Sequence, residues 1–233
     1  MAPNELRVVN NGPQSKKLDF SKIQASQYEN ISKEEWKFHF DYVEFLNAVS
    51  MVLPSLVSAY FGPSCSEDQY CRFLYFHCMV HLPFSFGFHT YHIFRPMTSE
   101  GVSLMLRRLD NMFIHIASIM ISYANSRSET YAALSAVPNI YYIIKILEDG
   151  RKPRLDGMML AILLYTGPMI YYGQVCLWTL TILGFVAGIL VFLKKILRPV
   201  HHPFMHCLMA WPQFTMLLGY LAVSSDVNYC PFW

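Results

Sequence analysis

The sequence predicts an all-α integral membrane protein with seven transmembrane helices, and three observations lead to this fold class. Of the 233 residues, 54% are hydrophobic and only 15% are charged, whereas soluble globular proteins carry about 25% charged residues. The apolar residues form runs close to the ~20 residues that one helix needs to cross a bilayer. Lys and Arg gather on one side of these runs, as they do in cytoplasmic loops.

The chain divides into a polar tail and a membrane domain. Residues 1–40 are predicted to be a cytosolic tail that ends in a short interfacial helix over 32–40, because Ser32 and Glu35 have the spacing of a capping box. Residues 41–233 form the membrane domain. Its predicted spans are 42–61, 72–94, 109–125, 129–147, 157–173, 175–193 and 203–224. Gly184 and Gly188 form a G-x-x-x-G pair that favours close helix packing in the sixth span.

The basic residues predict the orientation. With these seven spans, every Lys and Arg except Arg72 and Arg127 falls on the side of the N-terminal tail. Cytoplasmic loops are the basic ones, so the N-terminus is predicted to be cytosolic and the C-terminus extracellular or luminal. The pattern fits an endomembrane and the plasma membrane equally. The net charge of +2 argues against nucleic acid as a partner.

The six cysteines fall into two groups. One group is predicted to lie on the non-cytoplasmic side, where disulfides persist, and a bridge from either of its first two members to the last is expected: Cys65, Cys71 and Cys230. The other group lies inside the spans and is interpreted as packing residues: Cys78, Cys176 and Cys207.

Ionisable residues inside the spans are the main functional signal, because they are costly in a membrane and usually functional. His89 lies near the inner end of the second span, and Asp110 is predicted in the first turn of the third. His202 and His206 are four residues apart in the first turns of the seventh span, so their rings share one helix face. Ser85 lies one turn deeper than His89 on the same face. The other four are predicted to share one level of the membrane, close to the cytosol.

This combination of side chains predicts a metal site. Three neutral imidazoles suit a zinc ion that keeps an open coordination position, and a carboxylate could orient or deprotonate water there. Two substitutions of ligand stay open, His92 for His89 and His201 for His202. Asp110 has a simpler alternative role as the ion-pair partner of a neighbouring cation, Arg107 or Arg108.

The remaining span histidines are interpreted as hydrogen-bonded interior groups. His77 and His81 are four residues apart and lie farther toward the outside than His89. No carboxylate and no third histidine is predicted at their level. His115 is interpreted in the same way.

The candidate residues fall in three short segments: Ser85-Phe-Gly-Phe-His89, Leu106-Arg-Arg-Leu-Asp110 and His202-Pro-Phe-Met-His206. These segments resemble the signature segments of the progestin and adipoQ receptor/haemolysin III family, whose superfamily includes the alkaline ceramidases and GPI-processing lipid hydrolases. The resemblance covers residues 40–224 in architecture but only these segments in motif. Asn111 departs from it, because haemolysin III members often have histidine after the aspartate.

The resemblance implies a seven-helix fold with an intramembrane zinc. His89, His202 and His206 would be the ligands, Asp110 would hold or activate the water, and Ser85 would help to stabilise an oxyanion. The implied activity is hydrolysis of a lipid amide or ester, with a ceramide-like or other acyl lipid of the membrane as substrate. The alternatives are a membrane receptor or signalling protein with a structural zinc, and a haemolysin III-like protein that permeabilises membranes.

Overall fold

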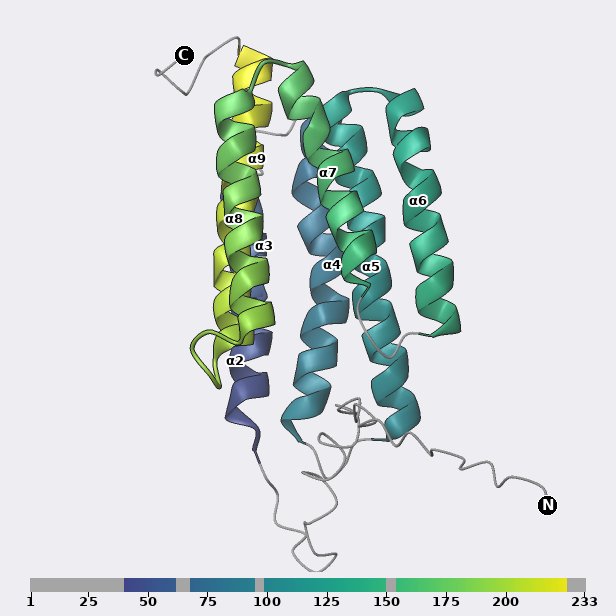
Figure 1. Cartoon of the computed structure of the whole chain (residues 1–233), viewed down its shortest axis with the longest axis vertical. Helices are drawn as coiled ribbons and strands as arrows, with labels where there is room; N and C mark the ends of the chain where they lie inside the picture. The colour runs from purple at the N-terminus through teal and green to yellow at the C-terminus, as the bar shows by residue number, and fades with distance from the viewer. Residues whose placement is uncertain (1–39, 62–67, 95–98, 150–153, 226–233) are drawn as a thin grey trace, which may run out of the picture. The chain divides into compact units, whose positions relative to one another are not determined.

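The computed structural model describes residues 40–61, 68–94, 99–149 and 154–225 of the chain, and these are almost entirely α-helical (Figure 1). The interfacial helix predicted over 32–40 lies outside the described residues, apart from Phe40. The described helices are α2 (Tyr42–Ser50), α3 (Val52–Phe61), α4 (Gln69–Ile93), α5 (Glu100–Ser126), α6 (Glu129–Glu148), α7 (Leu155–Tyr171), α8 (Val175–Lys194) and α9 (His201–Ser225).

These helices match the seven predicted spans in number and order, since only Met51 separates α2 from α3, and α5 alone begins well before its span. The all-α class is therefore confirmed. Three of the helices are long and apolar enough to cross a membrane, namely Tyr42–Tyr60, Val175–Lys194 and His201–Ser225. α7 is apolar but shorter.

Helix packing arranges these elements around a common interior. α4 packs against α2, α3 and α5, and α9 packs against α2, α3 and α8. α7 contacts both α5 and α8, so these helices close into a ring, and α6 packs outside it on α5 and α7. At one end, called here the histidine end, the last turns of α4 meet the first turns of α2 and α9. The other, called the opposite end, contains the starts of α4 and α8.

The α8–α9 pair shows why small residues matter in this fold. A Cβ atom at Gly184 would lie 2.7 Å from Trp211 Cδ1, and one at Gly188 would lie 2.0 Å from Met209 Cε. At Gly184 the rigid Pro212 ring would also lie 2.8 Å from such a Cβ atom, so glycine is needed there, whereas at Gly188 the flexible end of Met209 would have to move. The prediction that the G-x-x-x-G pair permits close packing is confirmed, although a sequence motif of this kind is weak by itself.

The start of α5 differs from the prediction. The third span was predicted to begin at residue 109, but α5 begins at Glu100, which follows the N-cap Ser99. Residues 100–108 include Glu, Leu, Met and Arg, which are good helix formers, so the helix extends past the two arginines that suggested a membrane boundary. Asp110 therefore lies in the third turn of α5 and not in its first, about 15 Å from the helix start.

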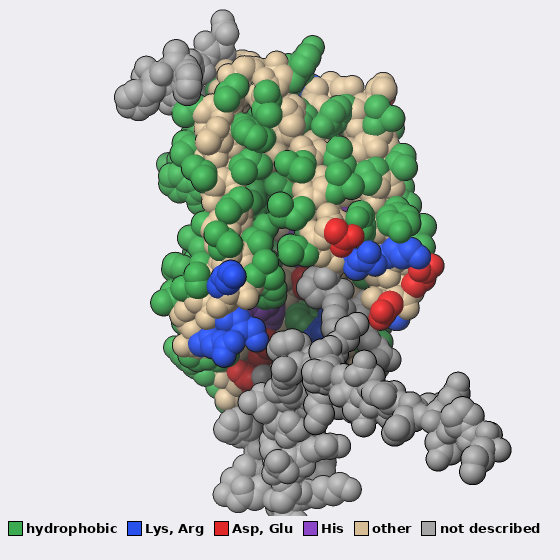
Figure 2. All heavy atoms as spheres, in the orientation of Figure 1, with side chains coloured by type: hydrophobic (Ala, Val, Ile, Leu, Met, Phe, Trp, Pro, Cys, Tyr) green, Lys and Arg blue, Asp and Glu red, His purple; other side chains and the backbone are tan. Residues whose placement is uncertain are grey.

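Many large hydrophobic side chains remain exposed on the outside of the bundle. On α6 they include Leu134, Val137 and Ile144, and on α8 Leu183 and Leu193. In Figure 2, hydrophobic side chains cover most of the visible face, while Lys and Arg side chains gather toward the histidine end. Contiguous apolar surface of this extent is typical of a lipid or protein interface.

The cysteines correct one interpretation. Cys71 and Cys176 each take part in a disulfide, so Cys176 is not the packing residue that its place inside a predicted span suggested. It is the second residue of α8, at the opposite end of the bundle, which contains the start of α4 with Cys71. Cys78 is free and buried as predicted, whereas Cys207 is free but exposed. Cys65 and Cys230 lie outside the described residues.

Candidate metal centre

Three histidines from two distant parts of the chain meet at the histidine end. His89 comes from the end of α4, and His202 and His206 come from the first two turns of α9. One ligand atom of each residue lies within 4.8 Å of those of the other two, so the group could hold a metal ion. The ring centroid of His89 lies 5.1 Å from that of His202 and 5.5 Å from that of His206. The predicted meeting of the α4 imidazole with the α9 pair is confirmed.

Hydrogen bonds assign the tautomer of His206. Its Nδ1 lies 2.9 Å from Ser50 Oγ. The hydroxyl of Ser50 donates its own hydrogen to the Asn47 carbonyl at 2.9 Å, so Ser50 Oγ accepts from the Nδ1–H of His206. The lone pair of His206 is therefore on Nε2.

His89 has the same tautomer for a different reason. Its Nδ1 lies 2.8 Å from Glu44 Oε2, and an ionised carboxylate can only accept. The Nδ1–H of His89 therefore donates to Glu44, which leaves the Nε2 lone pair available. An outward Nδ1–H bound to a carboxylate or oxygen is the usual support of a metal-ligating histidine.

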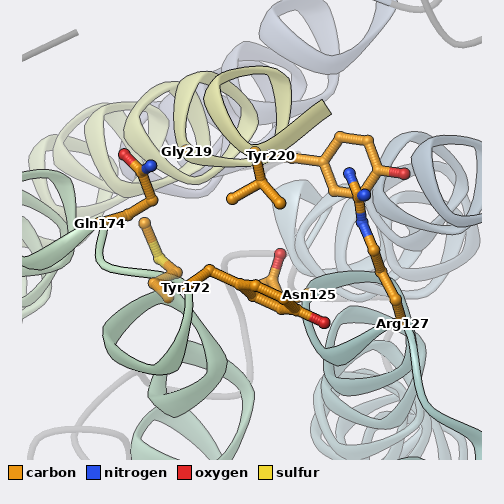
Figure 3. Close-up of a pocket in the computed structure, with 8 residues that line it drawn as sticks. Asn125, Arg127, Tyr172, Gln174, Gly219 and Tyr220 are labelled. Carbon is orange, nitrogen blue, oxygen red and sulfur yellow. The ribbon is translucent and has the colours of Figure 1, made fainter. Parts of the chain in front are cut away.

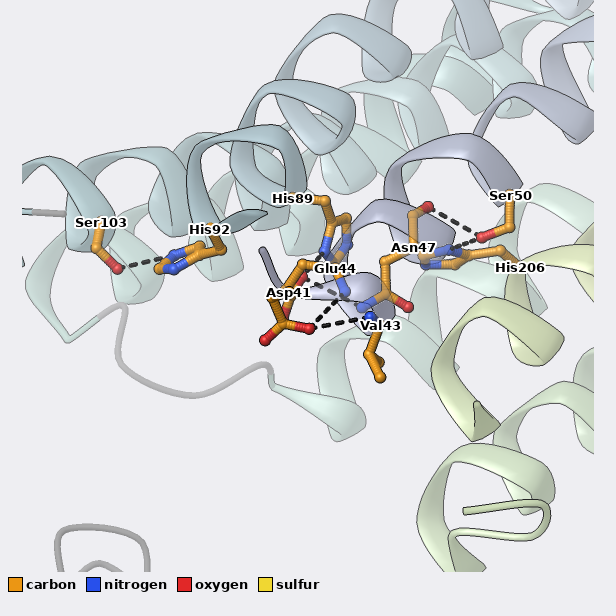
Figure 4. Close-up of polar contacts among 9 residues, drawn as sticks. All are labelled: Asp41, Val43, Glu44, Asn47, Ser50, His89, His92, Ser103 and His206. Atoms are coloured by element: carbon orange, nitrogen blue, oxygen red, sulfur yellow. Dashed lines mark hydrogen bonds and ion pairs between the residues drawn. The ribbon is translucent and has the colours of Figure 1, made fainter. Parts of the chain in front are cut away.

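The supporting residues come from α2, which sequence reasoning did not include in the site. Glu44, Asn47 and Ser50 are spaced three residues apart and so lie along one helix face (Figure 4). Asn47 Nδ2 donates to Glu44 Oε2 at 3.2 Å, and the Asn47 carbonyl accepts from Ser50. Asn47 therefore connects Glu44, the partner of His89, to Ser50, the partner of His206. A glutamate and an asparagine in an otherwise apolar first span were the available signal.

Asp110 lies beside these three histidines but outside the group they form. Its Oδ1 lies 3.1 Å from His81 Nε2, and Ser85 also interacts with its carboxylate. Asp110 is near enough to His89 and His202 to interact electrostatically with both. α5 extends further than predicted, so Asp110 meets α4 at His81 and Ser85 and not at the level of His89.

The prediction about His81 is therefore wrong, and the alternative partner of Asp110 is not the one described. His81 was predicted to have no carboxylate at its level, and Asp110 supplies one. The described contact of Asp110 is with His81, not with the arginines beside it in the sequence. The guanidinium of Arg107 instead lies 5.4 Å from the centroid of the Phe88 ring.

The other histidines lie outside the group. His92 Nε2 contacts Ser103 Oγ at 3.0 Å, and His201 Nδ1 has no hydrogen-bond partner within the described part of the chain. Neither joins His89, His202 and His206 in the geometry that the structure describes.

His77 and His115 are hydrogen-bonded interior groups, as predicted. His77 Nδ1 donates to the Leu74 carbonyl at 2.6 Å. His115 Nδ1 lies 2.8 Å from Asn139 Oδ1, and its ring stacks on Tyr142 at a centroid distance of 5.6 Å.

A shallow cavity at the opposite end has a different character (Figure 3). It lies between the ends of α5, α7 and α9, and several of its polar lining groups bind neighbouring side chains or the backbone. Asn125 Nδ2 donates to the Tyr165 carbonyl at 2.8 Å. The guanidinium of Arg127 lies over the Tyr220 ring, 4.7 Å from its centroid. Nothing in this lining resembles a ligand set for a metal.

Comparison of the sequence with family models and with curated proteins finds no match. The geometry of the histidine end is therefore the main guide to function.

Proposed function

We propose that the chain is a seven-helix integral membrane protein that hydrolyses a lipid amide or ester, ceramide-like in its chemistry, with zinc as cofactor. The observation that carries the proposal is the convergence of His89, His202 and His206 beside Asp110 and Ser85. The resemblance of the three segments to the progestin and adipoQ receptor/haemolysin III family points the same way.

The membrane part of the proposal rests on how the helices pack. Three helices have the length and apolar composition to cross a bilayer. The ring of contacts joins α4, α5 and α7 to them, and a bilayer around the apolar helices therefore surrounds the whole ring. α4, α5 and α6 have 25, 27 and 20 residues, enough to span a hydrocarbon core of about 30 Å.

The orientation rests on the two ends of the bundle. The disulfide-bonded Cys71 and Cys176 lie at the opposite end, and disulfides persist outside the cytosol. Lys194, Lys195 and Arg198 lie next to the start of α9, at the histidine end. Both features support a cytosolic N-terminus and a metal centre close to the cytosolic face.

The donor set fits zinc. Zinc in catalytic sites is often held by three protein ligands, and three imidazoles are one of its common sets. The Nδ1–H groups of His89 and His206 donate to Glu44 and Ser50 of α2, so each ring has the lone pair of its Nε2 free to bind a metal ion. Within the described residues, no hydrogen bond links the three rings to one another, which leaves these nitrogens available for a cation.

The side chains around the site supply the remaining chemistry. A zinc ion held there would polarise a carbonyl and lower the pKa of water. Asp110 would accept the proton of the attacking water and pass it to the leaving amine or alcohol as the acyl bond breaks. Ser85, buried beside Asp110, would turn its hydroxyl hydrogen from the Asp110 carboxylate to the developing oxyanion. The exposed apolar faces of the helices would let the acyl chain enter from the bilayer.

Two measurements test the proposal. Purified protein should contain about one zinc per chain, as three-ligand zinc sites do, and lose it on His202→Ala with His206→Ala. In proteoliposomes that contain a ceramide-like lipid, Asp110→Ala should lower turnover by about 10²–10⁴-fold, the contribution typical of a general base. A metal-free wild type would defeat the proposal, and so would turnover that survives Asp110→Ala.

One observation favours a second candidate, a receptor with a structural zinc. The described partner of Asp110 is His81 and not a member of the three-histidine group. Such a receptor would keep zinc but show no lipid turnover, so the two measurements separate the candidates.

A further inference from the structure

The contact between His81 and Asp110 has no role in the metal centre as described so far. His81 Nε2 lies 3.1 Å from Asp110 Oδ1, and the two side chains are 20% and 17% exposed. A carboxylate accepts, so the Nε2–H of His81 is the donor. This bond ties the middle of α4 to the third turn of α5.

The spacing of residues on α4 connects this contact to the metal centre. His81, Ser85 and His89 are four residues apart, so they follow one face of the helix over two turns. The first two bind the carboxylate of Asp110, and the third belongs to the three-histidine group. One rigid helix face therefore sets both the position of a ligand and the position of the carboxylate beside it.

The identity of the partner is informative, because two arginines lie nearby in the sequence. Arg107 and Arg108 lie three and two residues from Asp110, but its carboxylate contacts His81. A guanidinium is permanently charged and would hold the carboxylate as an ion pair. An imidazole N–H orients one oxygen and leaves the other able to accept a proton.

We propose that His81 is a positioning residue that orients Asp110 toward the three-histidine group through its bond to Oδ1. This inference rests on the proposed hydrolase function. In this role, His81 does not contact the substrate and is not a metal ligand. Residues that orient catalytic groups in this way typically change activity by about 10–100-fold.

The kinetic test uses zinc-loaded, full-length protein in proteoliposomes with a ceramide-like lipid. His81→Ala should lower kcat by about 10–100-fold with KM and zinc content unchanged. The double variant with Asp110→Ala should be no slower than Asp110→Ala alone, because His81 acts only through that carboxylate.

His81→Gln should restore most of the lost rate, since its amide can donate to the same oxygen. His115→Ala is the matched control: it removes a different histidine of the bundle interior, and should leave kcat unchanged.

A spectroscopic test does not depend on activity. In protein labelled with ¹⁵N-histidine, the Nε2 resonance of His81, identified by its absence in His81→Gln, should shift in Asp110→Asn. A shift supports the bond, and an unchanged resonance overturns the proposal whether or not the protein turns over lipid. If wild type hydrolyses lipid, a kcat of His81→Ala equal to wild type overturns the role of His81 alone. Zinc-loaded wild type without turnover defeats the hydrolase function, and the positioning role with it, even where the resonance shifts.

Discussion

The two ends of the bundle use polar side chains in opposite ways. At the histidine end, α2 orients the imidazoles of His89 and His206, whose Nε2 atoms remain available. At the opposite end, the polar groups bind each other: Asp68 caps α4 and accepts from the hydroxyl of Tyr220, and Arg127 covers the ring of Tyr220. The disulfide-bonded Cys71 and Cys176 lie at this second end.

The difference teaches which buried polar groups are candidates for function. A polar group in an apolar bundle must be bound, because an unsatisfied one is costly. At the opposite end, Asn125, Arg127 and Tyr220 find their partners inside the protein. At the histidine end the available nitrogens converge on one point, and a cation is the partner that their chemistry fits. Changes at the two ends should therefore have separable effects.

The largest effect is expected from removing a ligand. His206→Ala should lower zinc affinity by more than the ~10–100-fold that changes in surrounding residues cause, because one of three donors is lost. Zinc per chain after dialysis against a chelator measures this. His115→Ala should keep the metal. Full zinc retention by His206→Ala would contradict the assignment of His206 as a zinc ligand.

Loss of a disulfide should come next and should affect stability only. Cys71→Ser is expected to lower the free energy of unfolding by about 2–5 kcal/mol, the usual range for a native disulfide. Thermal unfolding in detergent measures the change, and zinc content should remain that of wild type. Cys78→Ser is the control, since Cys78 is free. Zinc loss in folded Cys71→Ser would show that the two ends are coupled.

A subtler change at the histidine end should act on the metal and hardly on the fold. Glu44→Gln keeps the shape of the side chain but replaces the carboxylate that accepts from His89 Nδ1. Zinc affinity is expected to fall by about 10–100-fold, measured by competition with a chelator. Glu148→Gln is the control, because Glu148 is exposed and pairs with Lys145. Equal zinc affinities in the two variants would show that Glu44 of α2 does not support the metal centre.

The smallest effect is expected at the cap of α4. Asp68→Ala removes an N-cap that accepts from Tyr70 N at 2.9 Å, at a cost of about 1 kcal/mol. Burial raises the pKa of Asp68, but hydrogen bonds from Tyr220 and the backbone outweigh burial and lower it below 3.8. The ionised cap is therefore stabilising above about pH 4, and its contribution is lost as the pH falls through the lowered pKa. Melting curves of wild type and Asp68→Ala should converge in acid, and a constant difference would contradict this.

Much of the fold was predictable because its signals are local. Apolar runs and the positions of Lys and Arg predicted helices that α2 to α9 match, with α2 and α3 forming one span. The spacing of His202 and His206 placed both rings on one helix face. The ligand group followed from these facts, because His89 and this pair lie near the same end of antiparallel helices.

The partners of the site were not predictable in the same way. Glu44 looked like a charge at the edge of the first span, and Asp110 was expected about 13 Å too close to the start of its helix, at 1.5 Å per residue. Cys176 looked like a packing residue because nothing nearby in the sequence marks a partner.

The sequence by itself determined the helices, their approximate ends and the three histidines, because helix periodicity and hydrophobic length depend on neighbouring residues. Only the tertiary structure decided that Glu44 and Ser50 support the imidazoles and that His81 holds Asp110. Those contacts depend on the rotation and axial offset of whole helices, which packing between distant segments sets. Close approaches such as that of α9 to Gly184 and Gly188 are part of that packing.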